Sequence, residues 1–542
     1  MESWKKILIV YFVLVGVKVV LSLFVVAPSV FSDEYIFSKL ARSVFVDQEF
    51  TVHGIAPNQQ FPLYPIMLSL TYLAADMEVI YFLMKVVNAF LLTSIIFPAF
   101  WVAKDFVSEK KAFLAALLVS FLPSVFVTSF YVMSENLFYP LVMWFVYFLY
   151  KTKRENKPKY FLGACIALVA AIWTKFAGVL LIPLPLINLL VGVKKERRLK
   201  VWGLSAVVLL VTMVLFFFFV RGSFYLTALP KFVNNVSVLI LPFVSWIVLY
   251  NGYVFLASGL LFGLYFLVGL KVKEKNFRFL WLITLLAFVL FVVAAANQSS
   301  SFRIFFESSF SWFTGRPVGR YVEAVLPLVV LTGFISFEKV KARIPMWIGI
   351  GASGLLGYGT LLTIAPLFPF NNSSLTLFGA LKYVLDFFFV GSFVDTRIVL
   401  PSFMILGIIL VSLPWLFLKK KEWQPYLVLA FFMMSSLLGF VVTVENSQKW
   451  YDAKQMVFGL EVKDLEGSKV VIDERDCVEK LYRESEGLCE LTKKSTLLGF
   501  WMNKDIIIGD VYREDADLII SRHRLNLEVV KDLNGEVLVY RP

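Results

Sequence analysis

Charged side chains lie at the ends of several apolar runs, and their types suit proton transfer and phosphate binding. Asp33 and Glu34 directly follow the first run, so two carboxylates lie side by side. Glu135 begins a later run, Lys175 separates two others, and Arg320 precedes another. A carboxylate can act as a general base, and a cation can stabilise charge that grows on a phosphate. These residues are therefore the first candidates for an active site.

Each of these residues also has a purely structural interpretation. Asp33 can lie at or near the cap of a helix with Glu34 in its first turn, because the helix dipole stabilises acidic groups there. Lys175 and the arginines can extend to lipid headgroups, and Glu323 can pair with Arg320 three residues before it. A charge within a span costs about 2.5–3.5 kcal/mol, so such groups tend to be paired or functional.

The composition indicates a polytopic membrane protein. Of the 542 residues, 59% are hydrophobic and only 17% are charged, whereas soluble domains average about 25% charged residues. The net charge of +13 does not indicate nucleic-acid binding, because the excess Lys and Arg lies in short loops between apolar runs. We therefore expect membrane lipids, and no nucleic acid, among the partners.

Apolar windows long enough to cross a bilayer predict about 13 transmembrane helices. The first run has no small-residue cleavage site after it and is predicted to be a retained helix. Basic loops such as KTKRENKPK and KKERRLK alternate with weakly charged ones. This alternation places the N-terminus in the cytoplasm and the C-terminal region outside, in a multi-pass protein of the cell membrane. The windows lie near 7–28, 79–103, 112–133, 136–150, 160–174, 176–193, 201–220, 250–270, 279–297, 321–337, 344–363, 398–418 and 425–444.

Two domains are predicted. Residues 1–444 form the transmembrane domain, whose outer loop 29–78 carries the two adjacent carboxylates, and residues 445–542 form a small extracytoplasmic α/β cap. In the cap, SKVVID, DIIIGDV and ADLIIS are typical of strands and CVEKLYRESE of a helix. A hairpin is predicted around Asn534-Gly535, a pair that suits a type I′ turn.

The outer loop is predicted to lie along the membrane surface as two short helices. In the first, over 35–45, Ile36, Leu40 and Phe45 are expected to face the membrane, while Lys39 and Arg42 extend to headgroups. The second, FPLYPIMLSLTYL, is too short to span.

The cysteines and histidines predict no metal site. Cys165 lies inside a predicted span and is expected in the core, while Cys477 and Cys489 lie in the cap, where they are either bonded to each other or free. The chain has only two histidines and no metal-ligand spacing, so we expect neither a metal nor another cofactor. Four N-x-[ST] triplets fall in the predicted outer loops or at their edges, at Asn235, Asn297, Asn371 and Asn372.

The motifs, taken in order, resemble a known group of membrane enzymes. SDEY followed by KLAR and FPLYPIMLSL resembles the first outer loop of GT-C glycosyltransferases of the dolichyl-phosphate-mannose–protein mannosyltransferase type. The bacterial relative of that group is the aminoarabinose transferase of lipid A. MSENLFYPL, WTKFAGVLLIPL and GRYVEAVLPL match further motifs, so the resemblance covers about residues 1–335. The tail after Glu445 shows no resemblance of this kind.

The resemblance implies transfer of a sugar from a polyprenyl-phosphate donor to an acceptor hydroxyl, with inversion, at the outer face. It implies Asp33 as the base, with Glu34 as a substitute or as the group that orients the acceptor. Lys175 and Arg320 are the first choices for the lipid phosphate, since its charge grows in the transition state. The acceptor stays open between a lipid, a glycan and a protein. The remaining candidates for the phosphate, sugar or acceptor are Arg316, Arg303, Tyr321, Tyr64, His53 and Glu135.

Two other functions are alternatives for such a chain. A transporter or lipid flippase typically has internal repeats and polar groups near the bilayer midplane, whereas here no repeat is evident and the polar residues gather at one face. A non-catalytic assembly protein would bind its partners through the cap, and Asp33 would then be dispensable.

Overall fold

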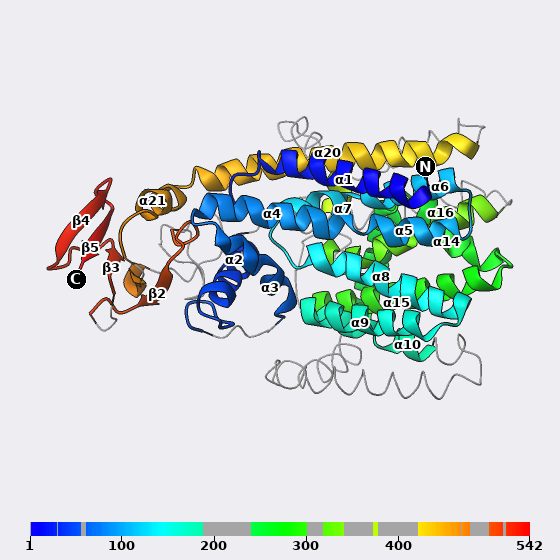
Figure 1. Cartoon of the computed structure of the whole chain (residues 1–542), viewed down its shortest axis with the longest axis horizontal. Coiled ribbons are helices and arrows are strands. Elements are labelled where there is room, and N and C mark those ends of the chain that lie inside the picture. The colour runs from blue at the N-terminus through cyan, green and yellow to red at the C-terminus, as the bar shows by residue number, and fades with distance from the viewer. Residues whose placement is uncertain are drawn as a thin grey trace. The chain divides into compact units, whose positions relative to one another are not determined.

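The computed structural model describes residues 2–29, 31–55, 61–187, 240–300, 318–340, 372–377, 421–467, 469–476, 498–512 and 516–542. This part of the chain is mostly helical and carries a small sheet near the C-terminus (Figure 1). The chain divides into two compact units. The helical unit comprises Met1–Gly16, Phe90–Ser129 and Ser134–Val442, and the sheet unit comprises Val17–Ala89, Phe130–Met133 and Thr443–Pro542.

Most of the long apolar helices belong to the helical unit. Here α8 packs against α9, α14 against α16, and α15 against α8, α13 and α16. Four elements have residues in both units, namely α1 (Ser3–Ser22), α4 (Met77–Thr93), η2 (Val127–Phe130) and α20 (Gln424–Tyr451). The others in the helical unit are α5 (Ile96–Lys104), α6 (Glu109–Ser120), α7 (Pro123–Phe126), α8 (Glu135–Glu155), α9 (Pro158–Thr174), η3 (Phe176–Leu181), α10 (Pro183–Ile187), α13 (Ile240–Ala257), α14 (Leu261–Val268), η5 (Gly269–Lys271), α15 (Lys275–Ser300), η7 (Gly319–Tyr321), η8 (Glu323–Val325), α16 (Leu326–Lys339), η10 (Ser373–Leu375) and η11 (Lys421–Trp423).

The predicted total of about 13 spans is not confirmed. Within the described residues, Met77–Lys104, Lys275–Ser299 and Lys421–Tyr451 are long and apolar enough to cross a membrane. Two further helix pairs are bent by 69° and 113° at a short break, and each can count as one more span. The first break lies before Pro123, and the second lies at Gly259 and Leu260, which both have positive φ. The predicted windows at 201–220, 344–363 and 398–418 lie outside the described residues.

The sheet unit combines the helices after the first apolar run with the C-terminal sheet. Its helices are α2 (Phe31–Val46), α3 (Leu63–Ser69), η1 (Leu70–Leu73), α21 (Lys454–Val462) and η12 (Glu474–Asp476). Its strands are β1 (Lys469–Asp473), β2 (Asp505–Gly509), β3 (Leu518–Ser521), β4 (Glu528–Leu533) and β5 (Val537–Arg541). α3 and η1 together are too short to span, as the sequence predicts.

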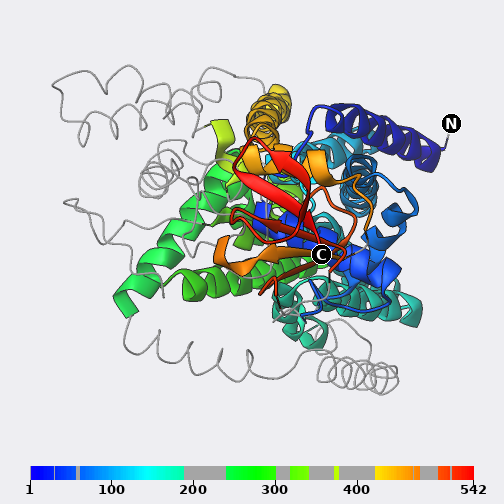
Figure 2. The same ribbon diagram turned by 90° about the vertical axis from the view of Figure 1, so that its left-hand side faces the viewer.

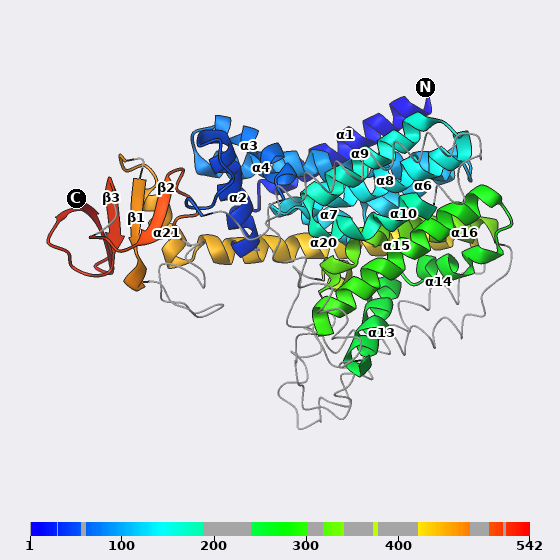
Figure 3. The same ribbon diagram turned by 90° about the horizontal axis from the view of Figure 1, so that it is seen from below.

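The C-terminal sheet has five strands in the order β2-β1-β3-β5-β4. β1 lies between β2 and β3 and pairs in parallel with both (Figure 3). β5 pairs antiparallel with β3 and β4. Successive side chains of β1 point to opposite faces of the sheet. Val470 and Ile472 pack in one hydrophobic cluster, together with Phe458 of α21, and Val471 packs in a second cluster. The strand predictions for SKVVID, DIIIGDV and ADLIIS are therefore confirmed, while the helix predicted over CVEKLYRESE lies outside the described residues.

The predicted hairpin is also confirmed. β4 and β5, red in Figure 2, are joined by a turn in which Asn534 and Gly535 have φ of 58° and 72°. Two successive positive φ values are the requirement of a type I′ turn, which few residue pairs other than Asn-Gly meet at low cost. Cys165 is buried, as predicted for the core, whereas Cys477 and Cys489 lie outside the described residues.

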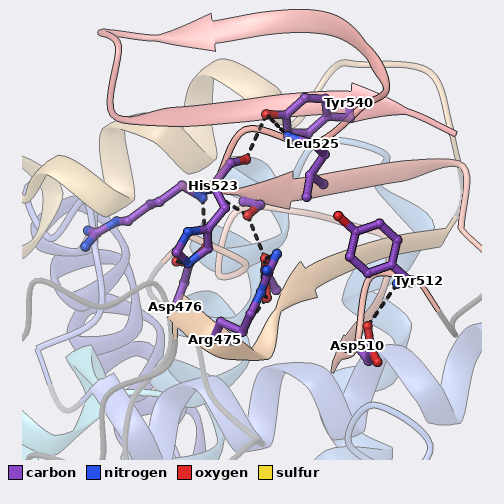
Figure 4. A network of polar contacts seen from close by, with 10 residues as sticks. Arg475, Asp476, Asp510, Tyr512, His523, Leu525 and Tyr540 are labelled. Carbon is purple, nitrogen blue, oxygen red and sulfur yellow. Dashed lines mark hydrogen bonds and ion pairs between the residues drawn. The ribbon is translucent and has the colours of Figure 1, made fainter.

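A polar network joins the carboxyl ends of the parallel strands β1 and β3 (Figure 4). Asp473, the last residue of β1, accepts a 2.6 Å hydrogen bond from the Ser521 hydroxyl at the end of β3. The Arg475 guanidinium donates to both oxygens of the same carboxylate. Asp476, three residues after Asp473, accepts a 2.8 Å hydrogen bond from the backbone N–H of Arg522, which directly follows β3. The network therefore ties two strands that are far apart in sequence.

Asp473 is expected to make the sheet sensitive to acid. Burial raises its pKa, but the bonds from Arg475 and Ser521 outweigh burial, so the pKa of Asp473 lies below its ordinary value of 3.8. The unfolded state then binds the proton more tightly, so this stabilisation is present above about pH 4 and is lost as the pH falls through the lowered pKa. Asp473→Asn should lower the local stability at neutral pH by about 2 kcal/mol, with the difference shrinking below pH 4.

Hydrogen exchange of the β1 and β3 amides at several pH values measures this effect. The exposed Glu528→Gln on β4 is the control and should leave these amides unchanged. Equal protection in Asp473→Asn and the native chain at neutral pH would contradict the interpretation.

The predicted surface role of the basic residues of α2 is wrong. Lys39 is 4% exposed and its ammonium donates to the carbonyl oxygens of Phe500 and Met502. Arg42 binds the carboxylate of Asp505. The segment before and into β2 covers this side of α2, so the two cations face protein rather than the membrane surface. Leu40, expected to face the membrane, is buried as well.

Candidate functional site

Glu34 is a buried anchor at the start of α2. It is 0% exposed, and its Oε2 accepts the Tyr81 hydroxyl of α4 and the backbone N–H of Val132, both at 2.9 Å. Its Oε1 accepts the N–H of Ser29 at 2.8 Å. Charge-assisted bonds of this kind are the strong class of hydrogen bond. The carboxylate thus fastens the first turn of α2 to α4 and to the segment 130–133.

Asp33 lies in a different environment from its neighbour. It is the third residue of α2 and is half-buried. Successive helical residues differ by about 100° in direction, so anchoring Glu34 turns Asp33 toward another side of α2. Because α2 begins at Phe31, Asp33 is not the N-cap residue. It lies in the first turn, where its negative charge interacts favourably with the helix dipole.

A buried lysine of α4, which the sequence analysis does not single out, lies near this pair. Lys85 is 2% exposed and donates to the carbonyl oxygens of Ser22, at 2.9 Å, and of Val25. It also interacts electrostatically with Glu34. Its sequence position could have indicated a role, because Lys85 is the single lysine inside the apolar window 79–103 before its end. A charge within a span is costly, so such groups tend to be paired or functional.

The predicted pocket residues Tyr64 and His53 have hydrogen-bonded positions in the sheet unit. The Tyr64 hydroxyl donates to the side-chain oxygen of Asn88 at 2.8 Å, and Asn88 donates to the Tyr131 carbonyl at 2.9 Å. His53 Nε2 lies 2.8 Å from the hydroxyl of Tyr35 on α2. Tyr64 is fully buried and His53 is partly exposed.

In the helical unit, Glu135 and Lys175 form an ion pair. Glu135 opens α8 and Lys175 caps the end of α9, and the Lys175 Nζ lies 2.5 Å from Glu135 Oε1. The side chain of Glu135 is 4% exposed and that of Lys175 is 24% exposed. Arg320 of η7 also interacts electrostatically with Glu135. Two cations therefore gather at one buried carboxylate, and Lys175 is paired with protein rather than extended to headgroups.

The segment that carries Arg320 is held by close packing and by Glu323. Gly319 lies against Tyr253, because a Cβ added there would come within 2.0 Å of the Tyr253 hydroxyl oxygen. That hydroxyl donates to Glu323 Oε1 at 2.6 Å, and the backbone N–H of Ser374 donates to the same atom at 3.1 Å. The pairing of Glu323 with Arg320 stays a prediction. Tyr321, next to Arg320, interacts electrostatically with Tyr250.

Gly319→Ala is expected to destabilise the helical unit. A methyl group cannot fit against Tyr253 unless the ring or η7 moves, and overpacking of this kind costs about 1–3 kcal/mol. Thermal unfolding of the purified chain measures the loss. Gly16→Ala is the matched control, since nothing lies within 4 Å of a Cβ added at Gly16. Equal unfolding temperatures for the two variants would show that Gly319 is not needed for this contact.

Some predicted site residues are not described. Arg303 and Arg316 lie outside the described residues, as do Asn235 and Asn371. Asn372 is 0% exposed, and its side-chain oxygen accepts the N–H of Gly319, so it is not open to glycosylation in this structure. Among the described residues, no group of three or more His, Cys, Asp or Glu side chains is placed to hold a metal ion.

Comparison with known proteins identifies the fold. The model of the family described as dolichyl-phosphate-mannose-protein mannosyltransferase matches residues 60–221. The crystal structure of ArnT from Cupriavidus metallidurans bound to undecaprenyl phosphate matches with a TM-score of 0.56 and 14% identity, over 98% of this chain and 97% of that one.

The apo crystal structure of the same ArnT matches with a TM-score of 0.53 and 15% identity, over 99% and 98% of the two chains. No curated protein is significantly similar in sequence. The predicted resemblance is confirmed: the chain has the fold of ArnT, and in part of its length it matches the dolichyl-phosphate-mannose-protein mannosyltransferase family.

Proposed function

We propose that the chain is a membrane glycosyltransferase that moves a sugar from a polyprenyl-phosphate donor to an acceptor hydroxyl, with inversion, at the outer face of the membrane. The observation that carries the proposal is the match, over nearly the whole chain, to an ArnT structure that holds undecaprenyl phosphate. The family model over residues 60–221 supports the same reaction class.

The charges around Glu135 suit a phosphate leaving group. As the bond between sugar and phosphate breaks, negative charge grows on the phosphate oxygens, and positioned cations stabilise it. Lys175 is paired with Glu135, and Arg320 also interacts electrostatically with this carboxylate, so two cations lie near Glu135. Glu135 holds the Lys175 ammonium in place, and Lys175 and Arg320 are proposed to face the lipid phosphate.

Asp33 is the proposed base. Inversion by a single displacement requires that the acceptor hydroxyl lose its proton while it attacks the anomeric carbon, so a carboxylate must accept that proton. Glu34 already accepts three hydrogen bonds within the protein, which suits an anchor better than a base. Glu34 then fixes the helix turn that carries Asp33. Tyr64, His53 and Tyr321 are proposed to line the sugar or acceptor.

Paired substitutions test the phosphate role. Purified protein in nanodiscs is given radiolabelled polyprenyl-phosphate sugars and a panel of acceptors. Lys175→Gln should lower kcat/KM by about 100-fold, the usual loss for one transition-state donor. Part of such a loss can arise because Glu135 is left buried without its partner.

The double variant Glu135→Gln/Lys175→Gln separates the two causes. If Lys175 stabilises the phosphate, the double variant stays as slow as the single one. If Lys175 only neutralises Glu135, the double variant recovers the native rate, and this outcome overturns the assignment. Failure of the native protein to transfer sugar from any donor of this class would contradict the proposed function.

A further inference from the structure

A polar pocket lies within the sheet unit, between α2 with the loop that follows it and the β2 edge of the C-terminal sheet. Its volume is about 280 Å³, close to the lower limit of the range typical of ligand sites. Lys39, Arg42 and Asp47 line it from the α2 side, and Lys504 and Asp505 line it from the sheet side. These five residues have no part in the proposed transfer reaction, although His53, which is proposed to line the sugar or acceptor, also lines the pocket.

Two of the lining residues are buried lysines that are held by neutral groups. Lys39 is 4% exposed and donates to the carbonyl oxygens of Phe500 and Met502 at 3.2 and 2.7 Å. Lys504 is 8% exposed and donates to the carbonyl oxygen of Leu465. Within the described part of the chain, neither ammonium has a carboxylate as a hydrogen-bond partner. Burying a charge is unfavourable unless it is paired and hydrogen-bonded to an opposite charge, and here the carboxylates Asp505, for Lys39, and Asp464 and Asp517, for Lys504, act only electrostatically.

The carboxylates at the pocket are already engaged by another cation. Arg42 forms ion pairs with both Asp505 and Asp47, so Asp505 is shared between Arg42 and Lys39, on which it also acts electrostatically. The pKa values show the imbalance. Burial, together with the neighbouring charge of Arg42, outweighs Asp505 and holds the pKa of Lys39 well below its ordinary value. Burial likewise outweighs Asp464 and Asp517 and lowers the pKa of Lys504.

We propose that this pocket binds a phosphate group between Lys39 and Lys504. A phosphate oxygen offers each ammonium the counter-charge that the backbone carbonyls do not supply, and bonds between ions of this type are short and strong. Because the pocket is lined by both α2 and β2, the bound group links the C-terminal sheet to the outer-loop helix. The source is either free phosphate or the headgroup of an anionic lipid, which share this chemistry.

Phosphate binding to the full-length protein tests the proposal. In phospholipid-free detergent at constant ionic strength, inorganic phosphate should raise the unfolding temperature saturably, by about 2–4 °C, and equilibrium dialysis with labelled phosphate should show binding at this site. In a second arm, nanodiscs of phosphatidylglycerol are compared with nanodiscs of phosphatidylcholine.

Variants of opposite sign make the test specific. Lys39→Met and Lys504→Met should each weaken phosphate binding by about 10- to 100-fold. Asp505→Asn should tighten binding, because it removes a negative charge from the pocket; general damage to the fold would not have this effect. Lys531→Met is the control, since Lys531 donates to the Glu461 carbonyl and does not line the pocket.

The outcomes separate the two sources. Lysine-dependent binding of inorganic phosphate supports the site and assigns it to free phosphate. Stabilisation that depends on the same lysines but occurs only with phosphatidylglycerol supports the site and assigns it to a lipid headgroup. Binding that is absent in both arms, or that is unaffected by Lys39→Met and Lys504→Met, overturns the proposal.

Discussion

Asp33→Asn is expected to lower the kcat/KM of sugar transfer by about 10²–10⁴-fold and to leave the unfolding temperature unchanged. The amide keeps the shape of the side chain but cannot accept the proton of the acceptor hydroxyl, and general-base catalysis contributes a factor of this size. The KM for the polyprenyl-phosphate donor should change little, because Asp33 acts on the acceptor. Initial rates with labelled donor, at several acceptor concentrations, measure the effect.

The control is Glu528→Gln, which removes an exposed carboxylate from β4 in the same unit. It should retain native rates and native stability. If Asp33→Asn retained a rate within about threefold of the native protein, far short of the contribution of a general base, another group would have to be the base.

Glu34→Gln, unlike Asp33→Asn, is expected to cause a large loss of folding stability. The Glu34 carboxylate accepts N–H groups from Ser29 and Val132 and a hydroxyl from Tyr81. A glutamine amide has one acceptor oxygen, so its NH₂ group must face at least one of these donors in a buried site. Leaving a buried donor unsatisfied costs about 1–3 kcal/mol, and more where the lost partner is charged. We expect a loss of about 2–4 kcal/mol in the free energy of unfolding.

Tyr81→Phe gives a reference value for this loss of stability. It removes one of the three hydrogen-bond donors and leaves the Glu34 carboxylate with the two backbone N–H groups. It should cost about 1 kcal/mol. Thermal unfolding and hydrogen exchange across α2 measure both variants. An unfolding temperature for Glu34→Gln equal to that of the native chain would mean that the three hydrogen bonds do not anchor α2.

The C-terminal sheet could be predicted because its signals are local. β1, β2 and β3 are short runs of β-branched residues, and the Asn534-Gly535 pair specifies its own turn. The strand order could not be read in the same way. It depends on contacts such as that between Asp473 and Ser521, which are separated by 48 residues.

The candidate site could be predicted as a set of residues but not as a set of contacts. The topology placed Glu135 and Lys175 at one face, yet their pairing across 40 residues follows only from the packing of α8 on α9. Glu34 is bonded to Val132, which is 98 residues away, and no local pattern indicates this. The sequence places Lys39 at the headgroups, because nothing near it in sequence predicts that residues 500–502 cover it.

The most direct test of the proposed reaction follows both products in one vesicle experiment. Proteoliposomes receive a polyprenyl-phosphate sugar labelled in the sugar and in the lipid, together with an acceptor at the outer face. The account predicts that native protein releases polyprenyl phosphate and forms glycosylated acceptor in equal amounts, and that Asp33→Asn forms both about 10²–10⁴-fold more slowly. Movement of intact donor across the membrane, or uptake of sugar with no glycosylated acceptor, would contradict it and would indicate a flippase or transporter.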